Sequence, residues 1–417
     1  MRLIVFSQYF PPEVGATQTR AAAIAAGFAE SGHEVEVVCE VPNHPQGVTR
    51  PGFQGRLCVR RESDGYRTTH LWVHTDPQKT VAKRLAFYAS YAIGASVAGS
   101  LMRRPDLVLA SSPPLPVAAA GAFAAWRHRV PWIMDIRDLW PEAAVAMGEL
   151  SSPLALRMAQ RLEKSLYRSA AAITVVTRPF QQAVSRQISY PPKIAVVPNG
   201  TTRFWLEGAA IQVARTELDL PDNVFLWTFA GNLGKAQGLE TAIDAAESLG
   251  PGFALLILGD GPARQELESR SRAAPGAHVI FRDQVEPEIA LRYLRASNAL
   301  LVSLSPDPVF ESFVPSKLYD FCAVGRPVVV AAAGEPRRLV EAADTGVTTP
   351  PGNSEALADA LRRLNADPQE CARLSMNGRL FAEHNLRDRH IERLVEIAER
   401  TVADARAARL WTRSLEP

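Results

Sequence analysis

The fold is decided by a strand–helix–strand unit in residues 3–39, whose sequence is LIVFSQYFPPEVGATQTRAAAIAAGFAESGHEVEVVC. The apolar run at residues 3–7 predicts a buried strand, and residues 35–39 predict a second one. Between them, the alanine-rich residues 19–31 predict a helix that ends at Gly32. Strands that alternate with helices pair in parallel through right-handed crossovers, so this unit predicts a doubly wound α/β sheet.

The alternation continues outward from this unit along most of the chain. Further strands are predicted at residues 106–110, 132–136, 172–176, 226–230, 254–259, 278–281, 299–303 and 327–331. Helices are predicted at residues 239–249, 287–297 and 316–324. The pattern pauses at the turn Pro198-Asn199-Gly200, which indicates a domain boundary. We therefore expect two Rossmann-like domains, residues 1–198 and 199–385, that face each other across a cleft.

The last segment, residues 386–417, is predicted to be a helical tail. Its apolar residues recur on one face at helical spacing, namely Ile391, Leu394, Val395, Ala398 and Val402. A helix with such a face has to bury it, so we expect the tail to pack back against one or both domains.

Length and composition limit the class of protein. The 417 residues suffice for two domains, and the 47% of hydrophobic residues can fill two cores. The formal net charge of +2 is nearly balanced, which argues against a nucleic-acid-binding protein. The four cysteines form no CxxC motif and no metal-like spacing with histidine, which favours a reducing cytoplasm. The first apolar run is too short for a signal peptide, so we expect no targeting signal.

Residues 85–102 contain no charged side chain and are flanked by Lys83, Arg84, Arg103 and Arg104. Alanine recurs at every third position from Ala86 onward, which predicts a small-residue face suited to packing on a sheet. We interpret the segment as a buried helix, with contact to a membrane surface as the alternative.

The loop after the first strand, residues 8–17, lacks the GxGxxG pattern of dinucleotide-binding folds, which argues against an NAD or FAD enzyme. Its prolines favour a stiff wall of a ligand cleft, although an ordinary connecting loop is the alternative. A second candidate site is residues 135–142, DIRDLWPE, at the carboxyl end of a predicted strand. Three carboxylates and an arginine so close together at this position indicate chemistry.

Two segments of the second half suit a diphosphate. Residues 231–238, GNLGKAQG, combine glycines that permit close backbone approach with the charge of Lys235, although glycine-rich turns are also common in scaffolds. Ser316 is a predicted helix N-cap, followed by Lys317 and, one turn later, Asp320. A lysine at a helix start with a carboxylate one turn on fits a diphosphate and ribose hydroxyls, and the alternative is a capped helix with an ion pair.

In this order, the motifs resemble the retaining glycosyltransferases of the GT-B class, family four, in the branch that builds O-antigen, colanic-acid and capsule repeats. The residues that carry the resemblance are YFPPEVG at 9–15, GHEV at 32–35, DIRDLWPE at 135–142, VPNG at 197–200, GNLG at 231–234, LGDGP at 258–262, PSK at 315–317 and GRPV at 325–328. The resemblance covers nearly the whole chain.

The resemblance implies that the second domain binds a nucleotide-sugar donor, with UDP expected, and that the first domain binds the acceptor. The implied donor-binding residues are Gly231, Asn232, Lys235, Gly259, Gly261, Val285, Ser316, Lys317 and Asp320. The implied acceptor-binding residues are Glu13, Gly15, Ala16 and Asp135. The implied catalytic residues are Arg137, Asp138 and Glu311.

The resemblance also implies the partners and the location. It implies transfer with retention, no cofactor and no metal, because a helix dipole and basic side chains neutralise the leaving diphosphate. The implied acceptor is a saccharide on a polyprenyl diphosphate, reached by a cytoplasmic protein that is peripheral to the inner face of the plasma membrane.

This sequence departs from the family pattern at several site positions. Asp320 stands at the second glutamate of the family's Glu-x7-Glu motif, and Ser312 at the first, beside Glu311. Asn232 and Gln237 replace an arginine and a lysine of the phosphate loop, which shifts their role to Lys235 and Lys317. Arg137 replaces a histidine, which shifts base or acceptor-orienting work to Asp138. Two alternatives therefore stay open: a sugar-nucleotide epimerase or hydrolase of the same fold, and a non-catalytic nucleotide-sugar-binding partner.

Overall fold

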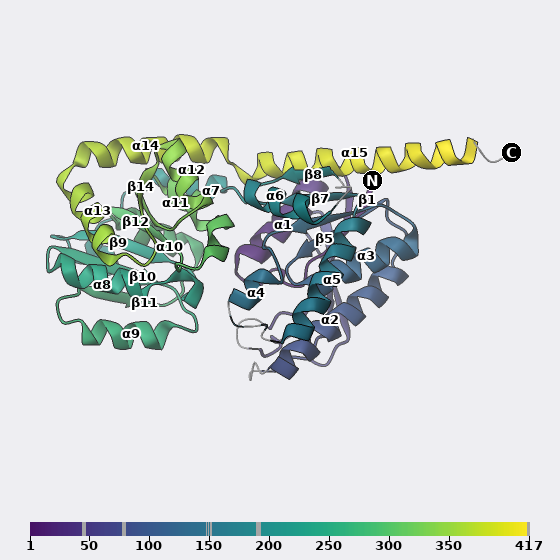
Figure 1. Ribbon diagram of the computed structural model, residues 1–417, viewed down its shortest axis with the longest axis horizontal. Helices are drawn as coiled ribbons and strands as arrows, with labels where there is room; N and C mark the ends of the chain where they lie inside the picture. The colour runs from purple at the N-terminus through teal and green to yellow at the C-terminus, as the bar shows by residue number, and fades with distance from the viewer. Residues whose placement is uncertain are drawn as a thin grey trace. The chain divides into compact units, whose positions relative to one another are not determined.

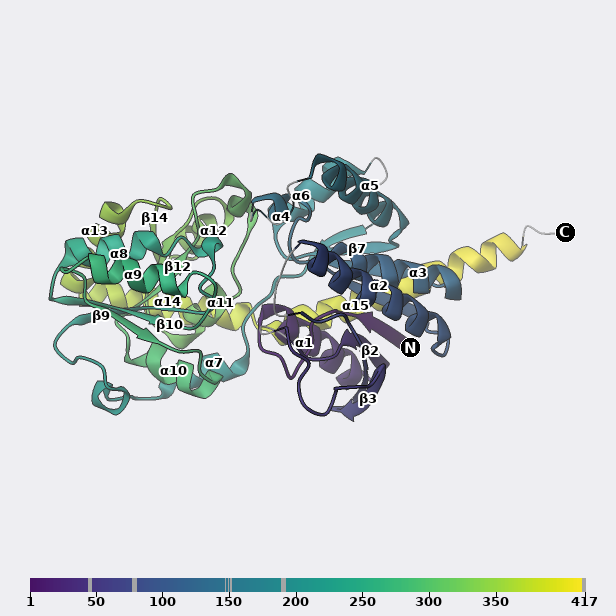
Figure 2. The ribbon, with the colours of Figure 1, turned by 90° about the horizontal axis from the view of Figure 1, so that it is seen from below.

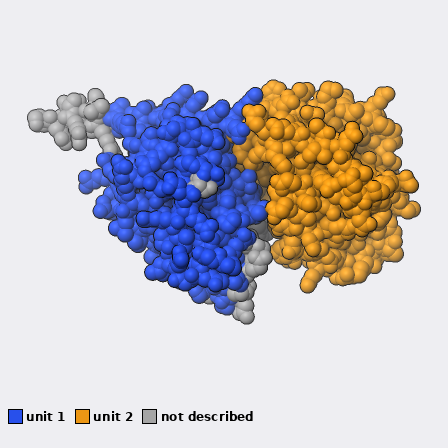
Figure 3. All heavy atoms as spheres, turned by 180° about the vertical axis from the view of Figure 1, so that it is seen from behind, with its two compact units in different colours: residues 1–198, 388–417 blue, residues 199–387 orange. Residues whose placement is uncertain are grey.

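The computed structural model describes residues 1–43, 47–76, 81–146, 148, 150, 152–188 and 193–414. The chain forms two compact units, residues 1–198 with 388–417 and residues 199–387 (Figure 3). Within each unit, helices cover both faces of one sheet (Figure 1).

The first unit contains an eight-stranded sheet in the order β3-β4-β2-β1-β5-β6-β7-β8. Its strands are β1 (Arg2–Phe6), β2 (Glu34–Glu40), β3 (Cys58–Ser63), β4 (Tyr66–Leu71), β5 (Leu107–Ser112), β6 (Trp132–Ile136), β7 (Ala172–Val175) and β8 (Lys193–Val196). Its helices are α1 (Ala16–Glu30), α2 (Val81–Leu101), α3 (Leu115–His128), α4 (Glu142–Ala146), α5 (Pro153–Ser169), α6 (Arg178–Gln187) and the C-terminal α15 (Arg387–Ser414). Among these described strands, every neighbouring pair except β3–β4 is parallel.

The second unit contains a parallel six-stranded sheet in the order β11-β10-β9-β12-β13-β14. Its strands are β9 (Phe225–Ala230), β10 (Phe253–Leu258), β11 (Val279–Arg282), β12 (Ala299–Ser303), β13 (Val328–Ala331) and β14 (Gly346–Thr349). Its α-helices are α7 (Arg203–Glu207), α8 (Glu240–Leu249), α9 (Arg264–Ala273), α10 (Pro287–Ala296), α11 (Lys317–Val324), α12 (Glu335–Ala343), α13 (Ser354–Ala366) and α14 (Pro368–His384). Short 3₁₀ turns are η1 (Gly208–Ala210), η2 (Arg215–Leu218), η3 (Lys235–Gln237) and η4 (Pro308–Ser312).

Both sheets are doubly wound, as predicted, and each has a point where the strand order reverses. In the first unit β1 lies between β2 and β5, and in the second unit β9 lies between β10 and β12. At such a point the connections that follow the two strands run to opposite faces of the sheet, and α/β folds bind ligands beside it, at the carboxyl ends of the strands. The candidate residues of the sequence follow these strands and their neighbours.

The antiparallel β3–β4 hairpin was missed, because β3 carries the charged Arg60, Arg61 and Glu62 and β4 carries polar residues such as Thr68 and Thr69 rather than an apolar run. A signal was present at the turn. Asp64 and Gly65 adopt positive φ values of 52° and 79°, which Asp-Gly supports well in a two-residue hairpin loop.

The C-terminal helix α15 packs as predicted. Its apolar face is buried in the core that α1 and β1 share. A Cβ on Gly27 of α1 would lie 2.4 Å from Ile391 Cγ2, so α1 and α15 approach closely at this glycine. The two helices together cover one face of the first sheet.

Helix α2 corrects the interpretation of residues 85–102 as a buried helix. Its small and aromatic side chains do face the sheet: Tyr91 and Ala95 are fully buried, and a Cβ on Gly99 would lie 2.5 Å from the ring of Phe6. Its large aliphatic side chains point outward, however, and Leu101 is 81% exposed. Close packing needs the small face, which leaves the large apolar face uncovered. No helix in the described part of the chain is both long and apolar enough to span a bilayer.

Candidate functional site

The loops after β9 and β12 of the second unit pack directly against each other. The backbone N–H of Ser305 donates to the carbonyl of Ala236 at 2.9 Å. A Cβ on Gly238, whose φ is +56°, would lie 3.1 Å from Ser305 Cα. The glycine-rich loop is therefore fixed at the point where the strand order reverses.

The loops after β9 and β10 brace each other through their backbones. The N–H of Leu233 donates to the carbonyl of Asp260 at 2.9 Å. A Cβ on Gly259 would lie 2.0 Å from the carbonyl oxygen of Gly231, and one on Gly261 would lie 2.6 Å from both N and O of Leu233. Gly259 and Gly261 are therefore required by loop packing, and their predicted contact with a donor stays a prediction.

Replacing Gly261 with alanine should destabilise the second unit. The added Cβ has to displace backbone, and overpacking of this kind costs about 2–3 kcal/mol of unfolding free energy. Gly252→Ala is the matched control, because its Cβ would meet no atom within 4 Å. Chemical denaturation should show the loss for Gly261→Ala and a change within about 0.5 kcal/mol for the control. Equal stability of the two variants would contradict the brace.

Lys317 begins α11 and turns back toward the glycine-rich loop. Its Nζ lies 3.7 Å from the centroid of the Phe229 ring and donates to Oε1 of Gln237 at 3.2 Å. A Cβ on Gly231 would lie 2.8 Å from this Nζ, so the glycine leaves room for the lysine. Burial lowers the pKa of Lys317 to about 7. A cation that has lost most of its water and faces no carboxylate is suited to accept an anion.

Ser316 occupies the N-cap position of α11, but its side chain makes no capping hydrogen bond, which corrects the predicted cap. Its φ of −58° and ψ of −32° are helical, whereas a capping serine needs extended backbone to reach the following amides. Lys317 is the first residue of α11, and the Ser316 side chain does not cap the amides of this first turn.

Asp320 does not form the alternative ion pair with Lys317. Its Oδ1 instead accepts a hydrogen bond from Thr201 Oγ1 at 2.7 Å. Burial raises the pKa of Asp320 to about 6, although the charge of Arg387 and the Thr201 hydrogen bond oppose the shift. Lys317 and Asp320 therefore contact different neighbours, although both lie on α11.

The other candidates of the second unit lie in different environments. Lys235 is exposed on η3, the turn that also carries Gln237, and Asn232 is exposed one turn earlier. Val285 follows β11 and packs against the apolar cluster around Leu258. Glu311 is exposed on η4, after β12.

Arg137 joins three loops at the carboxyl edge of the first sheet. Its Nε donates to Ser111 Oγ at 2.8 Å, its Nη1 to Thr17 Oγ1 at 2.5 Å and its Nη2 to the carbonyl of Pro113 at 2.9 Å. The neighbouring Asp138 has its pKa raised to about 6 by burial, which the charge of Arg137 partly opposes. A carboxylate with this pKa is largely ionised at neutral pH and can still accept a proton.

Asp135, a predicted acceptor-binding residue, is fully buried. Arg20 donates to both carboxylate oxygens, at 2.8 and 2.9 Å, and Thr174 donates to Oδ1 at 2.7 Å. Arg20 also donates to the carbonyls of Val197 and Pro198. Burial favours the neutral acid, but the Arg20 charge outweighs it and holds the pKa of Asp135 below its usual value. These contacts point to a scaffold role that fixes α1 and the end of the first unit.

The remaining acceptor candidates lie at the start of α1. Glu13 is buried, and its Oε1 accepts from the N–H of Asn43 at 2.6 Å. Gly15 is the N-cap of α1, and Ala16 is its exposed first residue. The next residue, Thr17, contacts Arg137, so the loop after β1 and the end of β6 meet at this hydroxyl.

Several contacts of the site were missed by the sequence analysis, namely those of Thr17, Ser111, Thr201, Phe229 and Gln237. A partial signal existed for Ser111, which is a polar residue at the carboxyl end of an apolar strand. Thr201 and Phe229 had no such signal, because their partners lie 119 and 88 positions away along the sequence.

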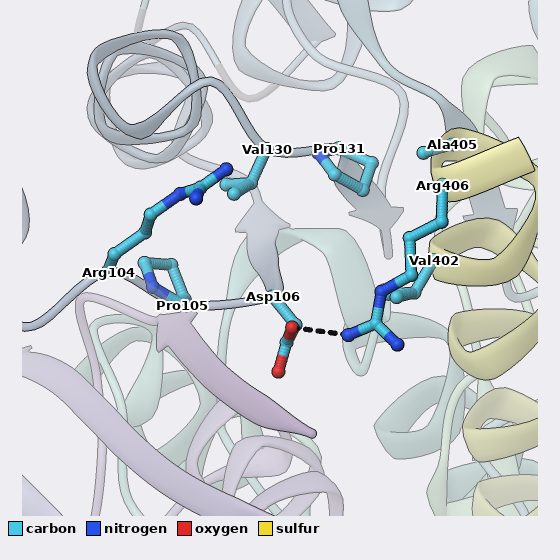
Figure 4. A pocket seen from close by; sticks show the side chains of 8 residues that line it. All are labelled: Arg104, Pro105, Asp106, Val130, Pro131, Val402, Ala405 and Arg406. Carbon is cyan, nitrogen blue, oxygen red and sulfur yellow. Dashed lines mark hydrogen bonds and ion pairs between the residues drawn. The ribbon is translucent and has the colours of Figure 1, made fainter. Parts of the chain in front are cut away.

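A pocket of about 300 Å³ lies elsewhere in the first unit (Figure 4). It is lined by Arg104, Pro105, Asp106, Val130, Pro131, Val402, Ala405 and Arg406. Asp106 and Pro131 immediately precede β5 and β6, so this pocket is at the amino edge of the sheet, opposite the predicted chemistry. Arg406 pairs with Asp106 at 2.6 Å within it. None of the candidate site residues lines it.

Comparison with known proteins gives consistent matches. The family described as "Glycosyl transferase 4-like domain" matches residues 15–200, and "Glycosyl transferases group 1" matches residues 211–381. The putative colanic acid biosynthesis glycosyl transferase WcaI of Escherichia coli (strain K12) is 24% identical over 377 residues, which are 87% of this chain and 92% of that protein.

Solved structures share the fold over nearly the whole chain. The sucrose-phosphate synthase of Thermosynechococcus elongatus has a TM-score of 0.73 at 19% identity, covering 97% of this chain and 99% of that chain. HepE of Anabaena in complex with UDP-glucose has a TM-score of 0.69 at 18% identity, covering 95% of this chain and 99% of that chain.

Proposed function

This chain belongs to the glycosyl transferases, and we propose that it transfers a sugar from a UDP-sugar to a saccharide carried on a polyprenyl diphosphate. The transfer would serve cell-envelope polysaccharide biosynthesis. The similarity to WcaI, named for colanic acid biosynthesis, supports this setting.

The observation that carries the donor proposal is the position of Lys317. It combines a desolvated ammonium, the start of α11 and the close backbone of Gly231 in one place. A diphosphate seated there would restore full charge to the lysine and accept hydrogen bonds from helix amides. The exposed Lys235 on the adjacent turn would add a second cation. HepE, which has the same fold, binds UDP-glucose, and this favours UDP as the nucleotide.

The same groups would assist bond cleavage. Negative charge collects on the diphosphate as its bond to the anomeric carbon breaks, and Lys317 and the dipole of α11 oppose that charge directly. We propose that no metal is needed and that the acceptor attacks from the face of the leaving group, through an oxocarbenium-like transition state, with retention. Glu311, exposed after β12, is the proposed carboxylate of the second unit that acts on the reacting centre.

The first unit would hold the acceptor at the carboxyl edge of its sheet. Arg137 is oriented by three hydrogen bonds and fixes the loop that carries Asp138. Asp138 is proposed to orient the acceptor hydroxyl and to accept its proton. Glu13, Gly15 and Ala16 would form the adjacent wall. The protein would work in the cytoplasm, peripheral to the membrane that holds the lipid-linked acceptor.

The donor proposal makes a specific prediction for Asp320, which we propose accepts hydrogen bonds from the ribose. Asp320→Asn removes the charge of the acceptor and should raise the dissociation constant of UDP about tenfold. Asp320→Glu should keep most of the affinity. Calorimetry with UDP in the presence of EDTA measures both effects and the proposed independence from metal.

Thr201→Val is the matched control for this experiment, since it removes the hydrogen bond to Asp320 Oδ1 and leaves the carboxylate in place. It should change the UDP affinity by less than threefold. If Asp320→Asn and Thr201→Val had the same small effect, Asp320 would have only a structural role. Absence of UDP binding to the wild-type protein would contradict the donor proposal as a whole.

A further inference from the structure

Three helices of the first unit form a continuous layer on the sheet face opposite α1 and α15. α3 contacts both α2 and α5, and Figures 1 and 2 show the three helices together. The layer exposes an unusual number of large apolar side chains, namely Leu85, Ile93, Val97, Leu101, Phe123, Trp126, Leu154, Met158 and Leu162. Trp126 is 71% exposed. Soluble proteins seldom leave so many large apolar groups uncovered on adjacent elements unless a partner covers them.

The outward direction of these side chains follows from how the helices pack. On α2 the apolar residues Ile93, Val97 and Leu101 recur every fourth position and lie opposite the buried Tyr91 and Ala95. On α5, Leu154, Met158 and Leu162 repeat the same spacing, and the helix is anchored by the buried Leu166 and Tyr167 instead. Each of these two helices thus has one face that packs against the protein and a second, apolar face that is exposed.

Basic side chains surround these apolar groups. The exposed ones include Arg103, Arg104, Arg127, Arg157, Arg161, Lys164 and Arg168. The only carboxylate on α2, α3 and α5 is Glu163, which is buried, accepts a hydrogen bond from Tyr167 at 2.5 Å and has its pKa raised to about 8 by burial. The layer therefore presents positive charge and no exposed negative charge.

The positive charge of the layer is concentrated on α5 and not on the basic residues that flank α2, where the sequence suggested it. Lys83 pairs with Asp76 at 2.7 Å, and Arg103 lies 4.0 Å from Glu34, so these two flanking charges are partly neutralised. The four basic residues of α5, by contrast, lie next to its exposed apolar stripe on the same helix. α5 thus carries most of the uncompensated charge.

We infer that the layer formed by α2, α3 and α5 is a docking surface for an anionic lipid bilayer. Its aromatic and aliphatic side chains enter the interface between headgroups and acyl chains while its arginines and lysines contact lipid phosphates. A single sign of charge beside exposed Trp and Leu fits an anionic lipid surface, because its phosphates can meet the basic side chains over the whole layer while its acyl chains receive the apolar ones. The inference rests on the proposed function in one respect, since a lipid-linked acceptor is the reason for this protein to bind a membrane. The vesicle-binding experiment that tests the surface does not depend on that acceptor.

Flotation with vesicles that contain one third phosphatidylglycerol tests the surface directly. The charge variant changes Arg157, Arg161, Lys164 and Arg168 to glutamine. Each basic residue near an anionic leaflet strengthens binding about fivefold, so this variant should bind at least one hundredfold more weakly. The matched control changes Arg272, Arg389, Arg393 and Arg400, which are exposed elsewhere, and should keep wild-type binding despite the same loss of charge.

The apolar half of the surface has its own variant. Leu101→Gln combined with Trp126→Gln should weaken binding about tenfold or more, since both side chains are exposed and their replacement leaves the core intact. Leu57→Gln combined with Met376→Gln is the matched control at exposed apolar positions outside the layer. Binding should also fall as salt rises, because the Debye length shortens.

Two readouts separate this inference from the proposed function. If the layer variants lose vesicle binding but transfer sugar normally to an acceptor dissolved in detergent, the surface and the function both stand. Wild-type protein that transfers sugar but does not bind vesicles would overturn the surface alone. Vesicle binding without transfer to any lipid-linked acceptor would leave the surface and overturn the function. Equal loss of vesicle binding in the layer variants and in their controls would mean that binding depends only on net charge or overall hydrophobicity, and this result would overturn the surface.

Discussion

Replacing Lys317 with alanine is expected to raise the dissociation constant of UDP by about 10- to 100-fold, because a charge-assisted contact to phosphate contributes about 1.5–3 kcal/mol. The ammonium lies against the Phe229 ring and one amide oxygen, so in the free protein it has lost water without gaining an opposite charge. A bound diphosphate is the group that would compensate this loss. Calorimetry of UDP binding is the measurement, and Arg272→Ala on the exposed side of α9 is the control.

Lys317 should also make the affinity for UDP depend on pH. Burial lowers its pKa to about 7 in the free protein, and a neighbouring phosphate has to raise it again. Above pH 7 the protein must therefore take up a proton when UDP binds, so the affinity falls as the pH rises from 7 to 9. Lys317→Ala should lack this dependence. An affinity that is unchanged by the substitution and flat with pH would remove Lys317 from the site.

Replacing Asp138 with asparagine is expected to lower kcat by about 100- to 10,000-fold, the usual range for the loss of a general base, while UDP affinity stays within twofold. Asp138 belongs to the first unit and is fixed beside Arg137, whereas the proposed nucleotide site lies in the second unit. A kinetic effect on transfer without an effect on UDP binding would therefore assign it to the acceptor step.

The pH profile distinguishes a base from a merely structural carboxylate. Burial raises the pKa of Asp138 to about 6 in the free protein, so below this pH the carboxylate is protonated and kcat/KM should fall, whereas above it kcat/KM should be level. Asp138→Asn should lose this acid limb along with the activity. Glu142→Gln, at an exposed carboxylate at the start of α4, is the control and should keep both. Full activity of Asp138→Asn would contradict the assignment.

The periodic features of this sequence were sufficient to predict most of the fold. Apolar runs that form the central strands, such as those of β1, β6 and β12, are buried on both sides and stand out without tertiary context. The charged strand β3 does not stand out, because it lies at the sheet edge and needs no continuous apolar run. Its neighbour β4 is buried but does not stand out either, because several of its buried residues are polar, namely Thr68, Thr69 and His70. For β3 the difference comes from its edge position, which is a tertiary property that the local sequence does not reveal.

The candidate site was predictable in position but not in contacts. Residues after the carboxyl ends of strands have to gather at one edge of each sheet, and Lys317 and Arg137 could be chosen on that ground. Their partners could not be predicted, since Thr17 meets Arg137 across 120 positions and Gln237 meets Lys317 across 80. The buried contact between Asp135 and Arg20 could not be predicted for the same reason, since the two residues are 115 positions apart along the sequence.

Retaining transfer is tested by an assay with purified protein, a UDP-sugar and a polyprenyl-diphosphate-linked saccharide in EDTA. The anomeric configuration of the product is determined by NMR. A panel of UDP- and GDP-sugars and acceptors finds the productive pair. We expect a longer lipid-linked saccharide whose new linkage keeps the anomeric configuration of the donor. A product of inverted configuration, or release of free or epimerised sugar with no extended acceptor across the panel, would contradict this expectation.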